Sequence, residues 1–268
     1  MGADPVVCVT GADGQVGRAL REWLPGARFL RRGDLDITEP AAVARELAGA
    51  AVVINCAALT DVDGCERDPR TADRVNAAGA ANVAAAGVRT IQLSTEYVFD
   101  GELEREYREE DEPAPRSVYG RSKLAGERAV LEAGRNLVVR TSWVFGDGRN
   151  FLRAIRAADR AGRELRVVDD QWGRPTWARD LARALAGLAA TGGPAGIVHF
   201  AGAGEPCTWA DLAELAVGRP VRRISSDEWG APAPRPRRAV LALDRARSMG
   251  LPLKDWRASV ASYLEAEA

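Results

Sequence analysis

Lysine, histidine and cysteine are scarce in this sequence of 268 residues. Lys123 and Lys254 are the only lysines among 37 basic residues, and His199 is the only histidine. The four cysteines have no metal-ligand spacing, and two of them fall in apolar runs, where a thiol usually packs as a small hydrophobe. We therefore expect no metal site, a structural role for His199 and a reducing, cytoplasmic setting.

Strong net charge and long apolar runs are also missing. The formal net charge is −1, which provides no global field to attract nucleic acid or an anionic membrane. No apolar run approaches the length of a membrane-spanning helix, and residues 1–7 lack the basic and apolar regions of a secretory signal. We expect a soluble protein with neither a nucleic-acid nor a membrane partner.

Short apolar runs alternate with helical patterns along the chain, which is typical of an α/β fold with a doubly wound parallel sheet of the Rossmann type. The expected strands are 5–10, 27–30, 51–56, 88–94, 136–141, 165–168, 197–200 and 221–224. The expected helices are 15–24, 39–47, 68–86, 117–133, 150–163, 175–190 and 208–216, and an acidic loop covers 99–115. We expect residues 1–145 to form the dinucleotide-binding core, joined by later strands and helices. Residues 146–268 would mainly form a small C-terminal α/β substrate lobe.

A glycine pattern follows the first expected strand and opens the first helix. Gly11, Gly14 and Gly17 stand where glycine permits a tight turn and a close approach of the backbone to a pyrophosphate. The helix amino terminus would add free N–H groups and the positive end of its dipole. The alternative is an ordinary strand-to-helix turn, but the position of the pattern favours a dinucleotide site.

The second expected strand is followed by arginines where an acidic residue normally holds the adenine ribose. Arg31 and Arg32 follow Leu30, and Asp34 comes slightly later. Because arginine can pair with a 2′-phosphate, we expect NADPH rather than NADH as the cofactor. NADH is the alternative. The alternative is two solvated arginines in an arginine-rich chain.

Tyr119 and Lys123 stand four residues apart in an expected helix, so both side chains reach the same space. A neighbouring ammonium group stabilises a phenolate and would lower the tyrosine pKa, which prepares the hydroxyl for proton transfer. In a chain with two lysines, a lysine at this spacing is suggestive, since a compact ammonium can also reach ribose hydroxyls. The pair predicts a catalytic role.

Ser94-Thr95-Glu96-Tyr97 ends the fourth expected strand. Ligands in doubly wound sheets bind beyond the carboxyl ends of the strands, so the Thr95 hydroxyl is expected to hydrogen-bond a substrate carbonyl. The alternative is a hydroxyl that only caps the end of the strand.

Several longer segments together resemble the dTDP-4-dehydrorhamnose reductase family of extended short-chain dehydrogenases. They are 11–17, 55–63, 94–99, 118–127, 140–144 and 170–176, with a looser match around Arg235, Pro236, Leu241 and Trp256. The resemblance implies NAD(P)H-dependent reduction of a 4-keto-6-deoxysugar linked to a nucleotide, most simply dTDP. A homodimer is one oligomeric state that such a protein can adopt.

The resemblance also implies roles for individual residues. Thr95, Tyr119 and Lys123 would form the catalytic triad. The cofactor would contact Gly11, Gly14, Gln15, Val16, Gly17, Asp34, Leu35, Ala57, Ala58 and Thr60, as well as Tyr119 and Lys123. The sugar nucleotide would face Val62, Glu96, Tyr97, Trp143 and Asn150. As alternatives, Trp143 would only fill the core and Asn150 would only cap a helix.

The chain departs from the family pattern at two positions near the expected sugar. Glu96 stands where the family usually has aspartate, and Ala239 stands where it commonly has serine.

Two rival functions stay open. A dehydratase or epimerase would keep its NAD bound, although Tyr97 occupies the place of the acidic residue that dehydratases use. A regulatory subunit of methionine adenosyltransferase would have no activity, although Thr95, Tyr119 and Lys123 are all present.

Overall fold

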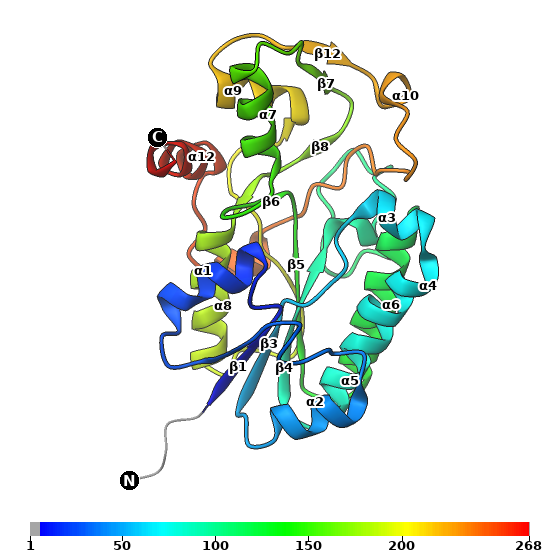
Figure 1. Ribbon diagram of the computed structural model, residues 1–268, viewed down its shortest axis with the longest axis vertical. Coiled ribbons are helices and arrows are strands. Elements are labelled where there is room, and N and C mark those ends of the chain that lie inside the picture. Colours follow the sequence, from blue (N-terminus) through cyan, green and yellow to red (C-terminus); the bar gives the residue numbers. More distant parts are fainter. Residues whose placement is uncertain (1–5, 268) are drawn as a thin grey trace.

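The computed structural model describes residues 6–267, which are built around a central parallel sheet (Figure 1). Its strands are β1 (Val7–Thr10), β2 (Arg28–Leu30), β3 (Val52–Asn55), β4 (Arg89–Thr95), β5 (Leu137–Thr141) and β10 (Gly196–His199). Their order is β10-β5-β4-β3-β1-β2, with every neighbouring pair parallel. The direction of winding reverses between β1 and β3, and such a switch point is where α/β sheets bind ligands. The expected doubly wound α/β fold is confirmed.

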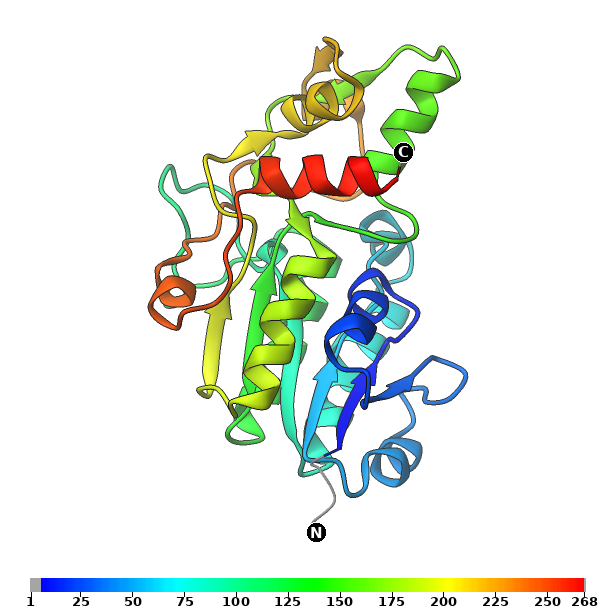
Figure 2. The same cartoon turned by 90° about the vertical axis from the view of Figure 1, so that its left-hand side faces the viewer.

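Helices cover both faces of the sheet (Figures 1 and 2). On one face, α1 (Gln15–Trp23) and α8 (Ala178–Ala190) pack their apolar side chains against the strands. The other face carries α2 (Pro40–Leu47), α5 (Ala80–Ala85) and α6 (Val118–Glu132). Because both faces are covered, the strands are almost continuously apolar, as their sequence indicates.

The expected helix 68–86 is instead three consecutive segments. These are α4 (Pro69–Asp73), the π-helical turn η1 (Arg74–Gly79) and α5. The π turn carries the buried Asn76, whose side chain bonds both the N–H and the C=O of Leu59 and also donates to Ser122 Oγ at 3.0 Å. Those three bonds provide a reason for the wider turn, and π turns often accompany functional sites.

A smaller group of elements lies above the carboxyl ends of the central strands (Figure 1). Its helices are α7 (Phe151–Arg160), α9 (Trp209–Val217), α10 (Ser226–Trp229) and α12 (Trp256–Ala266). Its short strands pair as β7 (Arg166–Val168) with β12 (Arg222–Ile224), β8 (Trp172–Gly173) with β11 (Cys207–Thr208), and β6 (Val144–Phe145) with β9 (Thr176–Trp177). We call this group the C-terminal lobe.

Some elements differ from the sequence-based expectation. Strand β10 belongs to the central sheet beside β5, although its residues fall in the C-terminal third. Helix α8 begins at Ala178 because the two residues before it form β9. Other elements were not expected, namely α3 (Val62–Arg67), η2 (Glu96–Val98), α10, α11 (Asp244–Ser248), α12 and β6, β8, β9 and β11. Residue 5, the expected start of the first strand, lies outside the described residues.

Between residues 6 and 267, no helix combines the length and apolar character needed to cross a membrane.

Candidate active site

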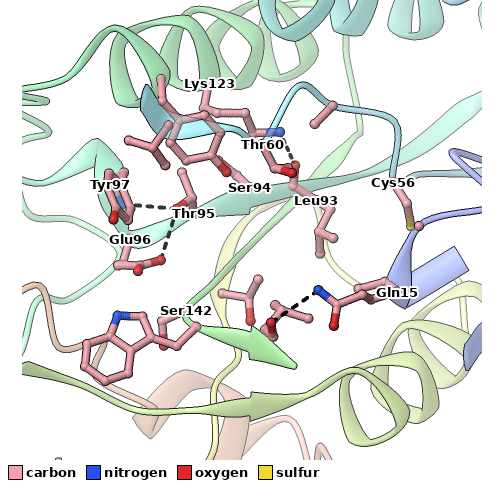
Figure 3. Close-up of a pocket in the computed structure, with 18 of the residues that line it drawn as sticks. Gln15, Cys56, Thr60, Leu93, Ser94, Thr95, Glu96, Tyr97, Lys123 and Ser142 are labelled. Atoms are coloured by element: carbon pink, nitrogen blue, oxygen red, sulfur yellow. Dashed lines mark hydrogen bonds between the residues drawn. The ribbon is translucent and has the colours of Figure 1, made fainter. Parts of the chain in front are cut away.

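A pocket of about 460 Å³ opens where the central strands end and the C-terminal lobe begins (Figure 3). Many of the predicted site residues line it, namely Gly14, Gln15, Val16, Gly17, Ala58, Thr60, Val62, Thr95, Glu96, Tyr97, Tyr119, Lys123, Trp143 and Asn150. A pocket of this size at this edge of the sheet fits a small-molecule site.

The turn between β1 and α1 requires its glycines. Gly11 has φ +66°, and a Cβ there would lie 2.6 Å from the backbone nitrogen of Ala57. A Cβ on Gly17 would lie 2.5 Å from the carbonyl oxygen of Gly11. Gly14 caps α1 without any side-chain hydrogen bond, so the first N–H groups of the helix stay available. Backbone can therefore approach a phosphate closely at this helix terminus.

A second hollow of about 240 Å³ lies beside this turn. The predicted residues that line it are Gly11, Gly14, Arg32, Leu35, Ala57 and Ala58. Arg31 and Asp34 are not among its lining residues. Instead, Arg31 Nε lies 3.0 Å from Asp34 Oδ2 in an exposed ion pair. The structure thus separates the two arginines, and Arg32 is the one beside the hollow.

Helix α6 brings Tyr119 and Lys123 to the wall of the first pocket. Ser117 caps the helix by accepting a hydrogen bond from the N–H of Gly120. A Cβ on Gly120 would lie 2.2 Å from the carbonyl oxygen of Tyr97, so glycine lets the helix start against η2. Lys123 Nζ donates to the carbonyl of Leu93 at 2.7 Å (Figure 3). The i, i+4 spacing therefore places both side chains on the pocket side.

The direction of the pKa shift of Tyr119 differs from the expectation. Burial, with the nearby Glu96 carboxyl, raises the pKa of Tyr119 above its ordinary value, whereas a lowered pKa was expected. Burial lowers the pKa of Lys123 to about 8. At neutral pH Tyr119 is therefore a phenol and Lys123 is mostly an ammonium. This state suits a tyrosine that gives up a proton.

Thr95 and Glu96 lie together at the end of β4 (Figure 3). The Thr95 hydroxyl donates to Glu96 Oε2 at 3.0 Å and accepts from the N–H of Tyr97 at 3.2 Å. Glu96 is buried, and burial raises its pKa to about 8. The pocket therefore holds a carboxyl group that is largely neutral at pH 7.

Trp143 and Trp209 form an aromatic wall on the side of the C-terminal lobe. Their rings stack at 3.7 Å between centroids and 11° between planes. Trp143 is the one described non-glycine residue with a positive φ, 43°. A Cβ on Gly173 would lie 2.5 Å from the Trp143 ring, so glycine leaves room for it. Strain at a pocket wall is a frequent feature of functional sites.

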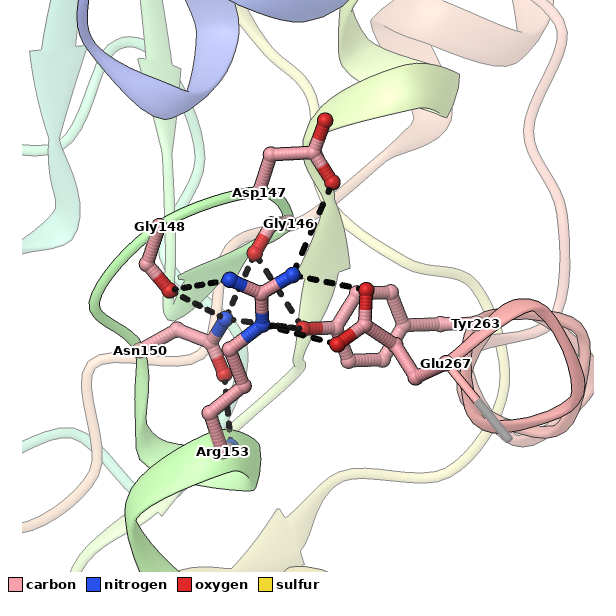
Figure 4. Close-up of polar contacts among 7 residues, drawn as sticks. All are labelled: Gly146, Asp147, Gly148, Asn150, Arg153, Tyr263 and Glu267. Atoms are coloured by element: carbon pink, nitrogen blue, oxygen red, sulfur yellow. Dashed lines mark hydrogen bonds and ion pairs between the residues drawn. The ribbon is translucent and has the colours of Figure 1, made fainter.

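Asn150 lines the pocket, but its side chain is already engaged (Figure 4). Its Oδ1 caps α7 by accepting from the N–H of Arg153. Its Nδ2 donates to the carbonyl of Gly146 at 2.6 Å and to the hydroxyl of Tyr263 at 3.0 Å. Helix capping, the alternative reading of this residue, is therefore observed.

Unpaired polar atoms in the pocket test whether a dinucleotide fits. In the described part of the chain, Gln15 Oε1, Ser94 Oγ and Thr141 Oγ1 are buried without a hydrogen-bond partner, and all three residues line the pocket. A buried polar atom left unpaired costs about 1–3 kcal/mol. The glycine turn and these atoms together fit a ligand with phosphates and polar ring substituents.

Several lining residues were given no site role in the sequence analysis, namely Cys56, Leu93, Ser94, Thr141, Ser142, Val144, Arg149 and Trp209. A sequence pattern could have predicted some of them as pocket residues. Thr141 ends an expected strand, and ligands bind at that end of such strands. Arg149 and Trp209 carry no such signal, since the folding of the lobe places them here.

These features define a Rossmann-type oxidoreductase site of the short-chain dehydrogenase kind, with a glycine turn, a strand-end threonine and a Tyr-x-x-x-Lys helix. Residues 6–268 match the family model described as RmlD substrate binding domain. The chain belongs to this family, that of the dTDP-4-dehydrorhamnose reductases.

Three relatives illustrate the likeness. The dTDP-4-dehydrorhamnose reductase of Streptomyces griseus is 44% identical over 94% of this chain and 90% of its own length. That of Mycobacterium tuberculosis is 41% identical over 97% of this chain and 92% of its own length. The crystal structure of the Bacillus anthracis enzyme in complex with NADP superposes with a TM-score of 0.92 at 32% identity, covering 98% of this chain and all of that one.

Proposed function

We propose that the chain reduces the keto group of a dTDP-linked 4-keto-6-deoxysugar with NADPH. The observation that carries the proposal is the meeting of Thr95, Tyr119 and Lys123 at one pocket beside the glycine turn. The names of the relatives favour the same substrate class.

Reduction of a ketone needs a hydride at carbon and a proton at oxygen, and the bound reduced nicotinamide supplies the hydride. Tyr119, protonated at neutral pH, donates its hydroxyl proton to the oxygen that gains negative charge. Lys123, which is mostly an ammonium at neutral pH, would supply positive charge at the same pocket and would bind a ribose hydroxyl of the cofactor. The Thr95 hydroxyl orients the carbonyl. Each of the three residues then has one role in the reduction of the ketone.

NADPH is the favoured cofactor. Arg32 lines the hollow beside the glycine turn, where a guanidinium can pair with a 2′-phosphate. The Bacillus anthracis relative was solved with NADP, which supports the same choice. Gly11–Gly17, Leu35, Ala57, Ala58 and Thr60 are proposed to contact the cofactor. Because Asp34 is paired with Arg31, we propose for it a role in holding that loop.

The sugar nucleotide is proposed to lie between the core and the C-terminal lobe, against Val62, Glu96, Tyr97 and Trp143. Asn150 would act by shaping the loop that precedes α7. A lobe beginning near residue 146 stays a prediction, as do a homodimer and a cytoplasmic location.

The test is the loss of reduced-nicotinamide absorbance when NADPH meets dTDP-4-keto-6-deoxyhexoses, alone and with a 3,5-epimerase. Oxidation of one NADPH per sugar would support the proposal. Tight cofactor binding without oxidation would favour the dehydratase or epimerase, or the regulatory subunit.

Tyr119→Phe provides the matched variant because it removes only the hydroxyl. It should bind NADPH normally and lose turnover by about 10²–10⁴-fold. Unchanged turnover would remove Tyr119 as the proton donor.

A further inference from the structure

Two of the unpaired polar atoms lie on the same side of the pocket. Thr141 Oγ1 and Gln15 Oε1 are both buried, and Thr141 is only 5% exposed. Thr141 ends β5, and Gln15 is the first residue of α1. The neighbouring β4 supplies Thr95 as the register partner of Thr141. Thr141 is thus the neighbour of the proposed catalytic threonine in the sheet.

Strand alternation places Thr141 on the α1 side of the sheet. Leu137 and Val139 point into the core formed with α1 and α8, and residues two apart share a face. Arg140, between them in sequence, points to the other face, where it pairs with Glu127 of α6. Ser94 is the register partner of Arg140 and therefore lies on the α6 side. Of the three unpaired oxygens in the pocket, those of Thr141 and Gln15 thus share the α1 side.

The orientation of the Gln15 amide determines which of its atoms is free. Its Nε2 donates to the carbonyl of Val144 at 3.4 Å, a bond drawn in Figure 3. Its Oε1 is left as an acceptor, while the Thr141 hydroxyl can donate. The pair thus presents one acceptor and one donor.

We propose that Gln15 and Thr141 bind the carboxamide of the nicotinamide ring and so fix the orientation of the ring. A primary carboxamide offers an NH₂ donor and a C=O acceptor, which complement Gln15 Oε1 and the Thr141 hydroxyl respectively. The inference rests on the dinucleotide part of the proposed function, and it does not depend on the sugar.

Thr141→Val tests the hydroxyl with almost no change in shape. The variant should bind NADPH about threefold to thirtyfold more weakly, as expected when one hydrogen bond to a buried group is lost. Binding of 2′,5′-ADP, which lacks the nicotinamide, should be unchanged. Both affinities are measured by titration calorimetry without any sugar. Because this hydroxyl has no partner in the described chain, the unfolding free energy should not fall.

Thr90→Val is the matched control. Thr90 is the second residue of β4, the strand beside β5, and lies at the end of β4 away from the pocket; its hydroxyl donates to the carbonyl of Val88 at 3.1 Å. This variant should lose stability and bind NADPH normally. Normal NADPH binding by Thr141→Val, or an equal loss for NADPH and 2′,5′-ADP, would overturn the proposal.

A cofactor analogue tests the role of Gln15. The 3-acetylpyridine analogue of NADP keeps the C=O but has a methyl group in place of NH₂. The wild-type chain should bind NADP about threefold to tenfold more tightly than the analogue, and Gln15→Leu should bind the two equally. Unaltered discrimination by Gln15→Leu would contradict the assignment. If these results hold and no ketosugar is reduced, the carboxamide site stands and the proposed function fails.

Discussion

Among single residues, Glu96 is a buried carboxyl group in the wall of the pocket. Burial raises its pKa from 4.5 to about 8. The folded protein therefore holds a proton on Glu96 that the unfolded chain releases above about pH 4.5. Its side chain places a neutral carboxyl next to Thr95, so this carboxyl presents both a donor and an acceptor at the wall of the pocket.

Glu96→Gln should therefore change how stability depends on pH. As pH rises from about 4.5 to about 8, ionisation of Glu96 opposes folding, and the wild type should lose up to about 1.4 kcal/mol per pH unit relative to the variant. Below that window the difference should be constant. Urea denaturation across the window measures it, with the exposed Glu104→Gln as the control. Parallel stability curves for wild type and Glu96→Gln would contradict the buried, neutral carboxyl.

Arg32 and Arg31 provide a matched pair for cofactor selectivity. Arg32→Ala should weaken NADPH binding about threefold to thirtyfold and leave NADH almost unchanged, because only NADPH carries the 2′-phosphate. Arg31→Ala should have a smaller effect, since Arg31 is held by Asp34. Titration calorimetry of each variant with NADPH and with NADH measures these affinities. Equal losses for NADPH and NADH in Arg32→Ala would end the 2′-phosphate argument.

The residues that could be predicted from the sequence are those fixed by local spacing. Gly11, Gly14 and Gly17 belong to one turn, and Tyr119 and Lys123 to one helix face. The stacked pair Trp143 and Trp209 depends on two segments far apart in sequence, so no local pattern predicts it. The separation of Arg31 from Arg32 depends on the ion pair with Asp34, which periodicity does not show.

At the level of elements, the contact with the π turn η1 positions α6, the helix that carries Tyr119 and Lys123. A Cβ on Gly126 of α6 would lie 2.2 Å from the carbonyl oxygen of Asn76. Asn76 in turn holds Leu59 and Ser122, so the loop after β3 and the helix with Tyr119 share one support. The sequence predicted helix on both sides of this contact, but the π turn depends on tertiary packing.

Gly126→Ala should therefore destabilise the fold by about 1–3 kcal/mol, because the new methyl group meets backbone that cannot move freely. Gly187→Ala in α8 is the control. Nothing lies within 4 Å of a Cβ there, so alanine should stabilise by about 0.5–1 kcal/mol. Chemical denaturation compares the two. Similar stability of both variants would show that the helix tolerates a wider spacing.

For the whole molecule, contacts between segments far apart hold the C-terminal lobe against the core. Arg235 pairs with Asp63 of α3 at 3.0 Å, and the buried Arg174 pairs with Glu106 of the acidic loop. Helix α12 adds Tyr263, whose hydroxyl accepts from Asn150 and Arg153 and donates to the carbonyl of Gly146 (Figure 4). The loop that lines the pocket is therefore held by the last helix.

Tyr263→Phe should loosen this loop, because the amide of Asn150 loses one acceptor. We expect a loss of about 1–2 kcal/mol in stability and a KM for the sugar nucleotide raised about threefold to tenfold, with kcat less affected. Glu265→Gln, on the exposed side of α12, is the control and should change neither. Steady-state kinetics measures KM and kcat. If Tyr263→Phe keeps the KM of the wild type, the hydrogen bonds of the Tyr263 hydroxyl support stability alone.

The most direct test of the central claim is the transfer of deuterium to a dTDP-4-keto-6-deoxysugar from NADPH that carries deuterium at both C4 positions of the nicotinamide. The proposed site predicts one deuterium atom on C4 of the sugar product, and labelled product formed about 10²–10⁴-fold more slowly when Tyr119→Phe replaces the wild type under the same conditions. A product without label, or label found on another carbon, would contradict reduction of the 4-keto group at this site.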